Sequence, residues 1–377
     1  VLSVFPFLML NMPFLQEENQ ITARQRYVHI VCGVIFWAFS FSYLFFYQAD
    51  VLAAGQHVLS HGQTHYNGFV GAVLITFALH IIQLTVARFA KLSEWAHAIT
   101  FFPSLLALTV VTDVSSNINK GFSFGGWYVA LPILIALFAA LVWALRKMEN
   151  SETLAASSGL LSRNMWVNIF SMVIMFFAVG AFSNGDEAFH YRMRMERLIG
   201  NGKYNKALKV GRRSTVKDST LTVLRAFALS KKGKLGEHFF EYPIAAGKRA
   251  SVLPDTNNLN VILLPDSVIA QHARYPKVKL EYRLTDLLIQ KKIGEFAKIA
   301  LKAYPDSVMM PKHYNEAMAI WKMQHAKYIP DSLLSYTEKE YKDFVIFINK
   351  EPKPTPFEIR RKYKITYWYY FFYDKTQ

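Results

Sequence analysis

Three histidines spaced four residues apart, His57, His61 and His65, form the first pattern in this sequence that suits chemistry. Residues four apart lie on one side of a helix, so the three imidazoles would face together over about two turns. Zinc takes neutral imidazoles and keeps one position open in catalytic sites. Glycines bracket the run, however, and neither an HExxH glutamate nor a carboxylate at metal spacing accompanies it. We therefore expect an interfacial polar helix without metal or cofactor, and keep the three histidines as candidate metal ligands.

A second pattern lies in the stretch TDVSSNINKGFSFGGW, where Gly121, Ser123 and Gly125 have G-x-S-x-G spacing. In hydrolases this spacing marks a strained strand-to-helix turn that exposes a serine nucleophile. No strand pattern precedes it here. We therefore expect an ordinary loop rich in Gly and Ser, with a nucleophilic Ser123 as the rarer alternative.

The elements that position these residues follow from composition. With 52% hydrophobic and 15% aromatic residues, the chain is too apolar to form soluble domains alone. A helix that crosses a bilayer needs about 20 apolar residues. Five segments qualify: 27–47, 68–87, 95–112, 125–145 and 165–183. The third is short and contains Pro103, so a re-entrant or tilted segment is the alternative there.

The orientation of these spans follows from Lys and Arg in the short loops, because positive side chains resist translocation. Seven of these residues lie on the side of the N-terminus, and one lies on the other side. They are Arg24, Arg26, Arg88, Lys91, Arg146, Lys147 and Arg163 against Lys120. We expect a bacterial inner-membrane protein with a cytoplasmic N-terminus and, after five crossings, a periplasmic C-terminal domain.

The charge separates the chain into two parts. Residues 1–184 contain 8 Lys and Arg against 7 Asp and Glu, whereas residues 185–377 contain 35 against 20. We predict a cytoplasmic segment at 1–26, a transmembrane domain at 27–184 and a periplasmic α-helical domain at 185–377. A basic domain outside the cell without a nucleic-acid motif suggests anionic lipid, acidic glycan or an acidic protein as partner, and no nucleic acid.

Polar residues from two loops then gather at the outer end of the spans. They are Asp50, His57, His61, His65, Asp113, Asn117 and Asn119. Such groups are either interfacial anchors or the mouth of a ligand site, and His57, His65 and Asp113 are the candidate catalytic residues. For His80 and Gln83, inside the second span, we expect hydrogen bonds between helices, with a substrate path as the alternative.

In the basic part the pattern is helical, and three stretches resemble one another: LIGNGKYNKALKV from Leu198, LSKKGKLGEHFFEYP from Leu229 and LIQKKIGEFAKIALKAYPD from Leu288. Each ends one helix, turns at Gly or Lys and begins another. The starts differ by 31 and 59 positions, which is typical of helical-hairpin repeats of the tetratricopeptide type. The fold class is therefore all-α, with a five-helix transmembrane bundle followed by a tetratricopeptide-like soluble domain.

Two regions depart from this pattern. Residues 243–278 are predicted to form a long connection or a degraded repeat. The last helix, FEIRRKYKITYWYYFFYDKTQ, either closes the stack with its aromatic side chains or contacts the membrane surface, where basic residues meet anionic lipid.

Several stretches resemble one family: FWAFSFSYLFFYQADVLAAGQHVLSHGQTHYNGFVGAVLIT, FFPSLLALTVVTDVSSNI, MPKHYNEAMAIWKMQHAK and TPFEIRRKYKITYWYYFFYD. They are similar to multi-pass membrane proteins of Bacteroidota that form a family of unknown function. The resemblance runs from about Arg24 to Phe372, and it implies that this chain is shortened around residues 243–278. It also implies an inner-membrane and periplasmic location, but no activity or site residues.

A stack of helical hairpins presents an extended face suited to binding proteins. We therefore expect a non-enzymatic scaffold or docking platform in envelope biogenesis. The alternative is a membrane enzyme or transporter component that acts on a lipid-linked or polar small molecule at the outer cluster of His57, His65 and Asp113.

Overall fold

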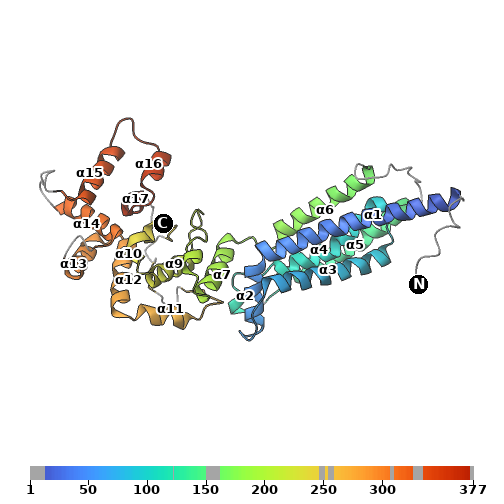
Figure 1. Ribbon diagram of the computed structural model, residues 1–377, viewed down its shortest axis with the longest axis horizontal. Helices are drawn as coiled ribbons and strands as arrows, with labels where there is room; N and C mark the ends of the chain where they lie inside the picture. Colours follow the sequence, from blue (N-terminus) through green and yellow to red (C-terminus); the bar gives the residue numbers. More distant parts are fainter. Residues whose placement is uncertain are drawn as a thin grey trace, which may run out of the picture. The chain divides into compact units, whose positions relative to one another are not determined.

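A computed structural model of the chain describes residues 13–121, 123–149, 162–245, 251–253, 259–305, 310–325 and 334–373. These residues form α-helices with short 3-10 and π-helical segments, and none of them forms a strand, so the predicted all-α fold is confirmed (Figure 1). The chain divides into two compact units, Val1–Asp186 (unit 1) and Glu187–Gln377 (unit 2). The change in net charge along the sequence, between residues 184 and 185, lies close to this division.

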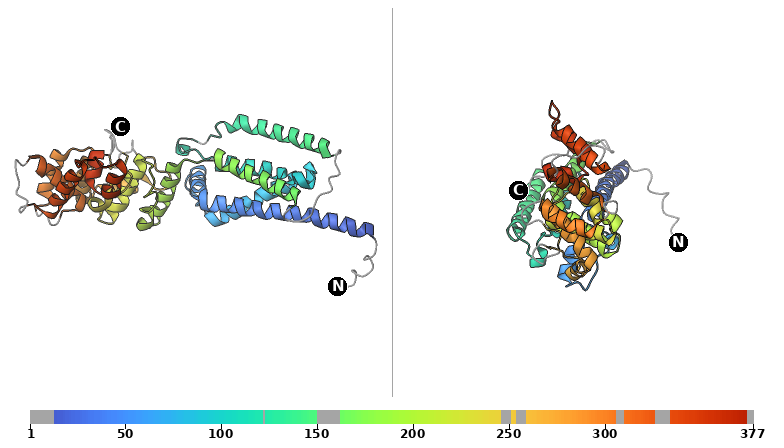
Figure 2. Two further views of the ribbon diagram at one scale, coloured as in Figure 1. Left: turned by 90° about the horizontal axis from the view of Figure 1, so that it is seen from above. Right: turned by 90° about the vertical axis from the view of Figure 1, so that its left-hand side faces the viewer.

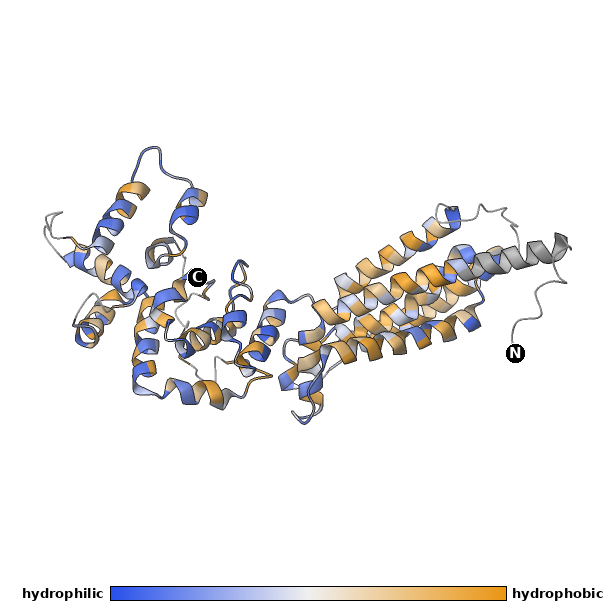
Figure 3. Cartoon of the chain, in the orientation of Figure 1, coloured by the Kyte–Doolittle hydropathy of each residue, from blue (hydrophilic) through white to orange (hydrophobic). Residues whose placement is uncertain are grey.

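Unit 1 contains five helical segments long and apolar enough to cross a membrane: Tyr27–Tyr47, Gly68–Ala90, Glu94–Thr112, Trp127–Met148 and Arg163–Phe182. The helices that supply them are α1 (Pro13–Ser42) with the π-helical η1 (Tyr43–Tyr47), α3 (Gly68–Ala90), the 3-10 helix η2 (Glu94–Phe101) with α4 (Phe102–Thr112), α5 (Trp127–Glu149) and α6 (Arg163–Phe182). Figure 3 shows that apolar residues dominate these helices. All five predicted segments are thus confirmed as helices able to span a bilayer.

The segment Glu94–Thr112 lies at the centre of the bundle. In its most apolar window 61% of residues are buried, against 6% for Trp127–Met148. Pro103 lies in the first turn of α4, where the fixed φ of proline is compatible with a helix. The left view of Figure 2 shows α5 apart from the other helices of unit 1. The segment least typical of a span in the sequence is therefore the best packed.

The hydrogen-bond geometry within the 3-10 helix η2 is poorer than that within an α-helix. Asn168 of α6 forms additional hydrogen bonds to the backbone of η2. Its Oδ1 accepts from the Ala98 N–H at 2.6 Å, and its Nδ2 donates to the Glu94 carbonyl at 2.7 Å. In lipid every backbone polar group must be satisfied within the protein. This buried amide therefore lets a 3-10 segment occupy the bundle centre.

Polar contacts also close both ends of the bundle. At one end, which we call the α2 end after the short helix α2 (Ala49–Leu59), Gln48 Nε2 donates to the Tyr43 hydroxyl at 2.9 Å and to the Asn184 carbonyl at 3.3 Å. Asn184 Nδ2 donates to the Val114 carbonyl. At the opposite end Arg146 of α5 donates through Nε to the Ala90 carbonyl of α3 at 2.6 Å. These hydrogen bonds link neighbouring helices and loops at both ends of the bundle, where the bilayer would end.

Unit 2 is a helical domain with one contiguous core. Its helices are α7 (Glu187–Gly200), α8 (Tyr204–Ala207), α9 (Ser219–Lys231), α10 (Leu235–His238), α11 (Asp266–Ala273), α12 (Pro276–Ile289), α13 (Ile293–Ala303), α14 (Lys312–His325), α15 (Tyr336–Ile348), α16 (Pro356–Tyr363) and α17 (Tyr367–Tyr373), with the 3-10 helix η4 (Phe239–Glu241) after α10. The core includes large side chains of α9, α12, α14 and α17.

The three predicted hairpin turns share one backbone geometry. Gly202, Gly233 and Lys291 each have positive φ, of 67°, 63° and 58°. At every turn the N–H of this residue donates to the carbonyl three residues back, and the next N–H donates to the carbonyl five residues back. These two bonds define a Schellman motif, which ends a helix with a left-handed residue. The pattern that recurs in the sequence therefore corresponds to the same turn geometry at all three positions.

The helices that follow these turns differ in length. α8 and α10 have four residues each, whereas α13 has eleven. The hairpins therefore share a turn geometry but differ in the length of the second helix.

Within residues 243–278, the described part between Pro243 and α11 is a non-helical connection. Buried side chains satisfy its backbone: Thr222 Oγ1 accepts from the Ala245 N–H at 3.0 Å, and Glu196 Oε2 accepts from the N–H groups of Ile262 and Leu263 at 2.8 and 2.7 Å. A buried backbone needs such partners because it has no ladder of its own.

The C-terminal region contains two helices, α16 and α17, rather than the single last helix predicted. The aromatic side chains of α17 close the core: Tyr367 and Tyr370 are buried, and their hydroxyls donate to the Leu288 and Ile289 carbonyls at 3.0 and 2.9 Å. These carbonyls lie in the last turn of α12, and the Leu288 carbonyl also accepts from the Lys291 N–H of the turn that follows. The burial of Tyr367 and Tyr370 fits the first expectation, that these aromatic side chains close the helical stack, rather than contact with the membrane surface.

Candidate functional site

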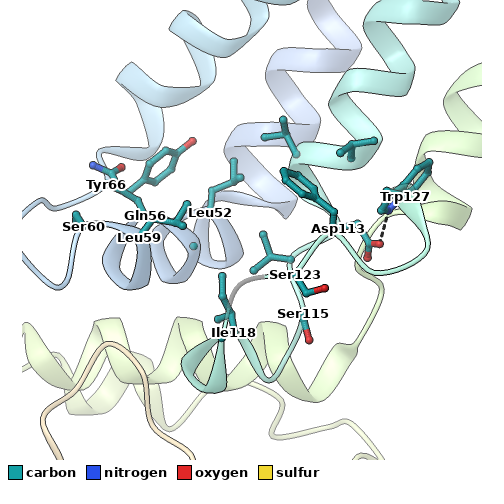
Figure 4. A pocket seen from close by; sticks show the side chains of 16 residues that line it. Leu52, Gln56, Leu59, Ser60, Tyr66, Asp113, Ser115, Ile118, Ser123 and Trp127 are labelled. Atoms are coloured by element: carbon teal, nitrogen blue, oxygen red, sulfur yellow. Dashed lines mark hydrogen bonds between the residues drawn. The ribbon is translucent and has the colours of Figure 1, made fainter. Parts of the chain in front are cut away.

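Two adjoining hollows lie at the α2 end of unit 1, with volumes of about 500 and 570 Å³. Volumes of this size are typical of small-molecule sites. The first hollow is lined by residues of α2, the end of α4 and the loop before α5, and Figure 4 shows how they surround it. The second lies beside it and reaches Phe182 and Asn184. Asp113, Ser115, Ser123 and Trp127 line both hollows.

Helix α2 forms one wall of the first hollow because small residues let it approach the rest of the bundle. Ala53, Ala54 and Gly55 are buried on it. A Cβ atom on Gly55 would lie 3.6 Å from a methyl carbon of Val114, in ordinary contact. Leu52 and Gln56 flank this glycine on the wall. A larger side chain at Gly55 would fill space between α2 and the loop.

Asp113 and Trp127 join the two sides of the site. Asp113 follows the last residue of α4, and Trp127 is the first residue of α5. The indole Nε1 donates to Asp113 Oδ2 at 2.7 Å (Figure 4). Since the Trp127 ring is held at the start of a span, it also has the position of an interfacial aromatic anchor. The carboxylate is thereby fixed at the boundary of the two hollows.

Tyr66, in the connection between α2 and α3, is a further wall residue of the first hollow. Burial raises the pKa of its phenol to about 12. The ring lies so close to α3 that a Cβ atom on Gly71 would come within 2.4 Å of it. Gly71 is therefore required for Tyr66 to occupy this position, and the tyrosine stays neutral at physiological pH.

The three histidines do not share a face, in contrast to the sequence expectation. Helix α2 ends at Leu59, so only His57 is helical. His61 has a left-handed φ of 50°, and His65 lies in the following loop. None of the three lines either hollow. Within the described residues no three His, Cys, Asp or Glu side chains lie close enough to hold a metal ion.

The G-x-S-x-G stretch does not form the turn that activates a serine. The described residues around Ser123 lie in a loop without a strand before it, and α5 begins only at Trp127. Ser123 Oγ accepts a hydrogen bond from the Gly125 N–H at 3.1 Å. It lines both hollows, but no imidazole does. The described lining residues therefore offer hydroxyls and one carboxylate for binding.

The other predicted polar residues have separate positions. Asp50 is buried in the first turn of α2, Asn117 is exposed in the loop after α4, and Asn119 is exposed in the 3-10 helix η3 (Ile118–Lys120). Gln83 donates to the Thr100 hydroxyl of η2 at 3.1 Å, so its predicted role between helices is confirmed. His80 instead packs near Phe36 and Trp37, and its Nδ1 has no hydrogen-bond partner among the described residues.

Of the predicted site residues, Asp113 lines both hollows, and the apolar wall was not predicted from the sequence. This wall consists of Leu52, Leu59, Val110, Val111, Val114, Ile118, Phe124 and Trp127 together with Tyr66. These residues look like parts of spans and loops in the sequence. The one available signal was Trp127 at a span boundary, where aromatic side chains mark the membrane interface.

Comparison with known proteins gives one match. A family model described as a family of unknown function, DUF6057, matches residues 127–266 and 246–374. The matched ranges begin at α5 and continue through unit 2, and they overlap inside the stretch where the hairpin pattern is interrupted. No curated protein and no solved structure matches the chain.

Proposed function

Since the chain belongs to DUF6057, a family of unknown function, and contains five helices able to cross a membrane, we propose that it is a membrane-anchored docking platform. Unit 2 binds an acidic protein partner. In this proposal the spans lie in a bacterial inner membrane, the N-terminus is cytoplasmic and unit 2 works in the periplasm in envelope biogenesis. The seven-to-one bias of Lys and Arg among the short loops supports this orientation.

The observation that carries the proposal is a basic segment, residues 190–217, formed by α7, α8 and the turns before α9. Eight of its side chains are exposed cations: Arg194, Arg197, Lys203, Lys206, Lys209, Arg212, Arg213 and Lys217. Its one acidic residue, Glu196, is buried. The exposed surface of this segment therefore presents a single sign of charge.

Such a surface attracts an acidic partner and speeds its association. Exposed arginines also suit protein interfaces because the guanidinium group forms paired hydrogen bonds with carboxylates. One of them, Arg212, already binds Glu241 of η4 at 2.8 Å, which holds its guanidinium group in place at the surface.

The catalytic alternative at the α2 end has less support. It required His57 and His65 to act with Asp113, and neither histidine lines the hollows beside that carboxylate. We therefore propose no reaction there.

The test introduces a photo-crosslinking residue at Lys206 in the full-length chain and irradiates living cells of the native host. We expect a discrete adduct with a protein. The matched control position is Lys353, which is also exposed but has Glu351 close by in the sequence. The double variant Lys206→Glu with Lys209→Glu, probed at Arg197, should lower the adduct at least about fivefold, and Lys339→Glu with Lys353→Glu should leave it unchanged.

If Lys206 crosslinks only to lipid, or gives no adduct while the chain accumulates in membranes, unit 2 does not dock a protein through this segment. Equal loss in both double variants would likewise remove the basic segment from the proposal.

A further inference from the structure

We propose that the two hollows at the α2 end bind one amphiphilic molecule of the bilayer. Its apolar chain occupies the first hollow, and a head group that donates hydrogen bonds and has no net negative charge occupies the second. This site lies in unit 1 and is independent of the docking function proposed for unit 2.

The first hollow has the chemistry of an acyl-chain site. Its lining is mainly aliphatic and aromatic. Two of its polar residues bond to groups outside the lining: Gln56 donates to the Thr64 hydroxyl at 2.9 Å, and the Ser115 hydroxyl accepts from the Asn117 N–H at 3.2 Å. An apolar hollow of about 500 Å³ favours the transfer of a hydrocarbon chain from water or lipid headgroups.

Lipid can reach this hollow from the side. Leu59, Val111 and Phe124 line it and remain 60%, 46% and 42% exposed. Val111 lies in the last turn of α4, a helix whose other turns are largely buried. Since that turn belongs to a segment able to span the membrane, its exposed apolar side chains lie where acyl chains and headgroups meet.

The second hollow suits a head group. Ser115, Ser116, Ser123 and Asn184 line it, and they supply hydroxyl and amide groups. Asp113 is the one charged side chain that lines either hollow in the described part of the chain. A lone carboxylate repels an anionic head group and attracts an ammonium group. Because the Trp127 indole holds Oδ2, the carboxylate has a fixed position between head and chain.

The test reconstitutes the full-length chain in bilayers of phosphatidylethanolamine and phosphatidylglycerol in equal amounts. After mild detergent extraction, native mass spectrometry counts the lipid retained per chain. We expect about one bound lipid, with phosphatidylethanolamine preferred about fivefold. Asp113→Asn keeps an acceptor for Trp127 and removes the charge, so it should retain lipid while the preference falls to about onefold.

Two variants fill the first hollow by different routes. Gly55→Phe places a ring between α2 and the loop, and Val111→Trp extends a side chain that is already partly exposed. Both should lower lipid retention at least about fivefold. The control is Gly180→Phe in α6, where nothing lies within 4 Å of a new Cβ atom; it should retain lipid as the unaltered chain does.

Equal lipid on the unaltered chain, Gly55→Phe and Val111→Trp would overturn the proposal, because the hollow would then not hold the chain. A preference for phosphatidylglycerol, or one that Asp113→Asn leaves intact, would overturn the assignment of the head group. If a filling variant does not fold, the Asp113→Asn result decides, since that change alters charge without altering volume.

Discussion

At the scale of single residues, buried polar side chains in both units bind backbone groups of segments that are not α-helical. Asn168 of unit 1 binds the backbone of Glu94 and Ala98, and Glu196 of unit 2 binds that of Ile262 and Leu263. An unpaired buried backbone group costs free energy comparable to a lost hydrogen bond. These side chains therefore allow irregular backbone inside packed helices.

Replacing Asn168 should destabilise the transmembrane bundle. Asn168→Leu removes the side-chain hydrogen bonds to the Ala98 N–H and to the Glu94 carbonyl of η2, at about 0.5–1.5 kcal/mol each. We expect a lower thermal midpoint of the full-length chain in detergent. Ser171→Ala is the control, because the Ser171 hydroxyl on the same helix only donates to the carbonyl of Val167 in its own helix. A midpoint that falls equally in both variants would show that Asn168 has no special role.

The Glu196 carboxyl should make unit 2 sensitive to pH. Burial raises the pKa of Glu196 to about 7, outweighing the backbone donors and Arg192 that favour the charged form. A carboxyl whose pKa is higher in the folded state contributes stability at low pH and loses it as pH rises from about 4.5 to 7, in total about 3 kcal/mol.

Glu196→Gln keeps an acceptor for Ile262 and Leu263 and cannot ionise. The variant should therefore gain stability relative to the natural chain as pH rises from 5 to 8, measured by thermal unfolding in detergent. If the difference between the two chains is the same at pH 5 and pH 8, the Glu196 carboxyl does not titrate in this range.

At the scale of elements, the left-handed residue after α7, α9 and α12 sets where each hairpin turns. Gly202 has φ of 67°, and nothing lies within 4 Å of a Cβ atom added to it, so a substitution there tests backbone conformation alone. Gly202→Ala should destabilise unit 2 by about 1–2 kcal/mol, the cost of a left-handed conformation for a residue with a Cβ atom.

Gly294→Ala provides the matched control in chemical denaturation. Gly294 also has open space around it, but it lies in α13 with an ordinary φ. Alanine favours a helix relative to glycine, so this variant should be neutral or more stable by up to about 1 kcal/mol. If Gly202→Ala and Gly294→Ala changed the free energy of unfolding in the same direction, the left-handed turn would not explain the effect at Gly202.

At the scale of the whole molecule, an odd number of crossings would put the two ends of the chain on opposite sides of the membrane. A fusion of alkaline phosphatase at Gln377 should be active, because this enzyme folds only outside the cytoplasm. A fusion after Met148, at the end of the fourth span, should be inactive as phosphatase and fluorescent with a cytoplasmic reporter. Phosphatase activity at both positions would mean that a span has been assigned wrongly.

The sequence by itself determined which segments are apolar enough to span a membrane and where the hairpins turn. The Tyr27–Tyr47 span depends on summed hydropathy along one segment, and the turns at Gly202 and Gly233 depend on one residue with freedom in φ. Both are local properties, so neither requires knowledge of neighbours.

Only the tertiary structure decided which of these elements meet. Glu94–Thr112 lies at the centre of the bundle, where Asn168 of another helix binds its backbone. Asp113 binds Trp127 of another helix, and none of the three histidines lines the hollows beside it. A hollow exists where side chains from separate segments fail to fill the space between them. That depends on the facing surfaces of several helices, which no local pattern in the sequence specifies.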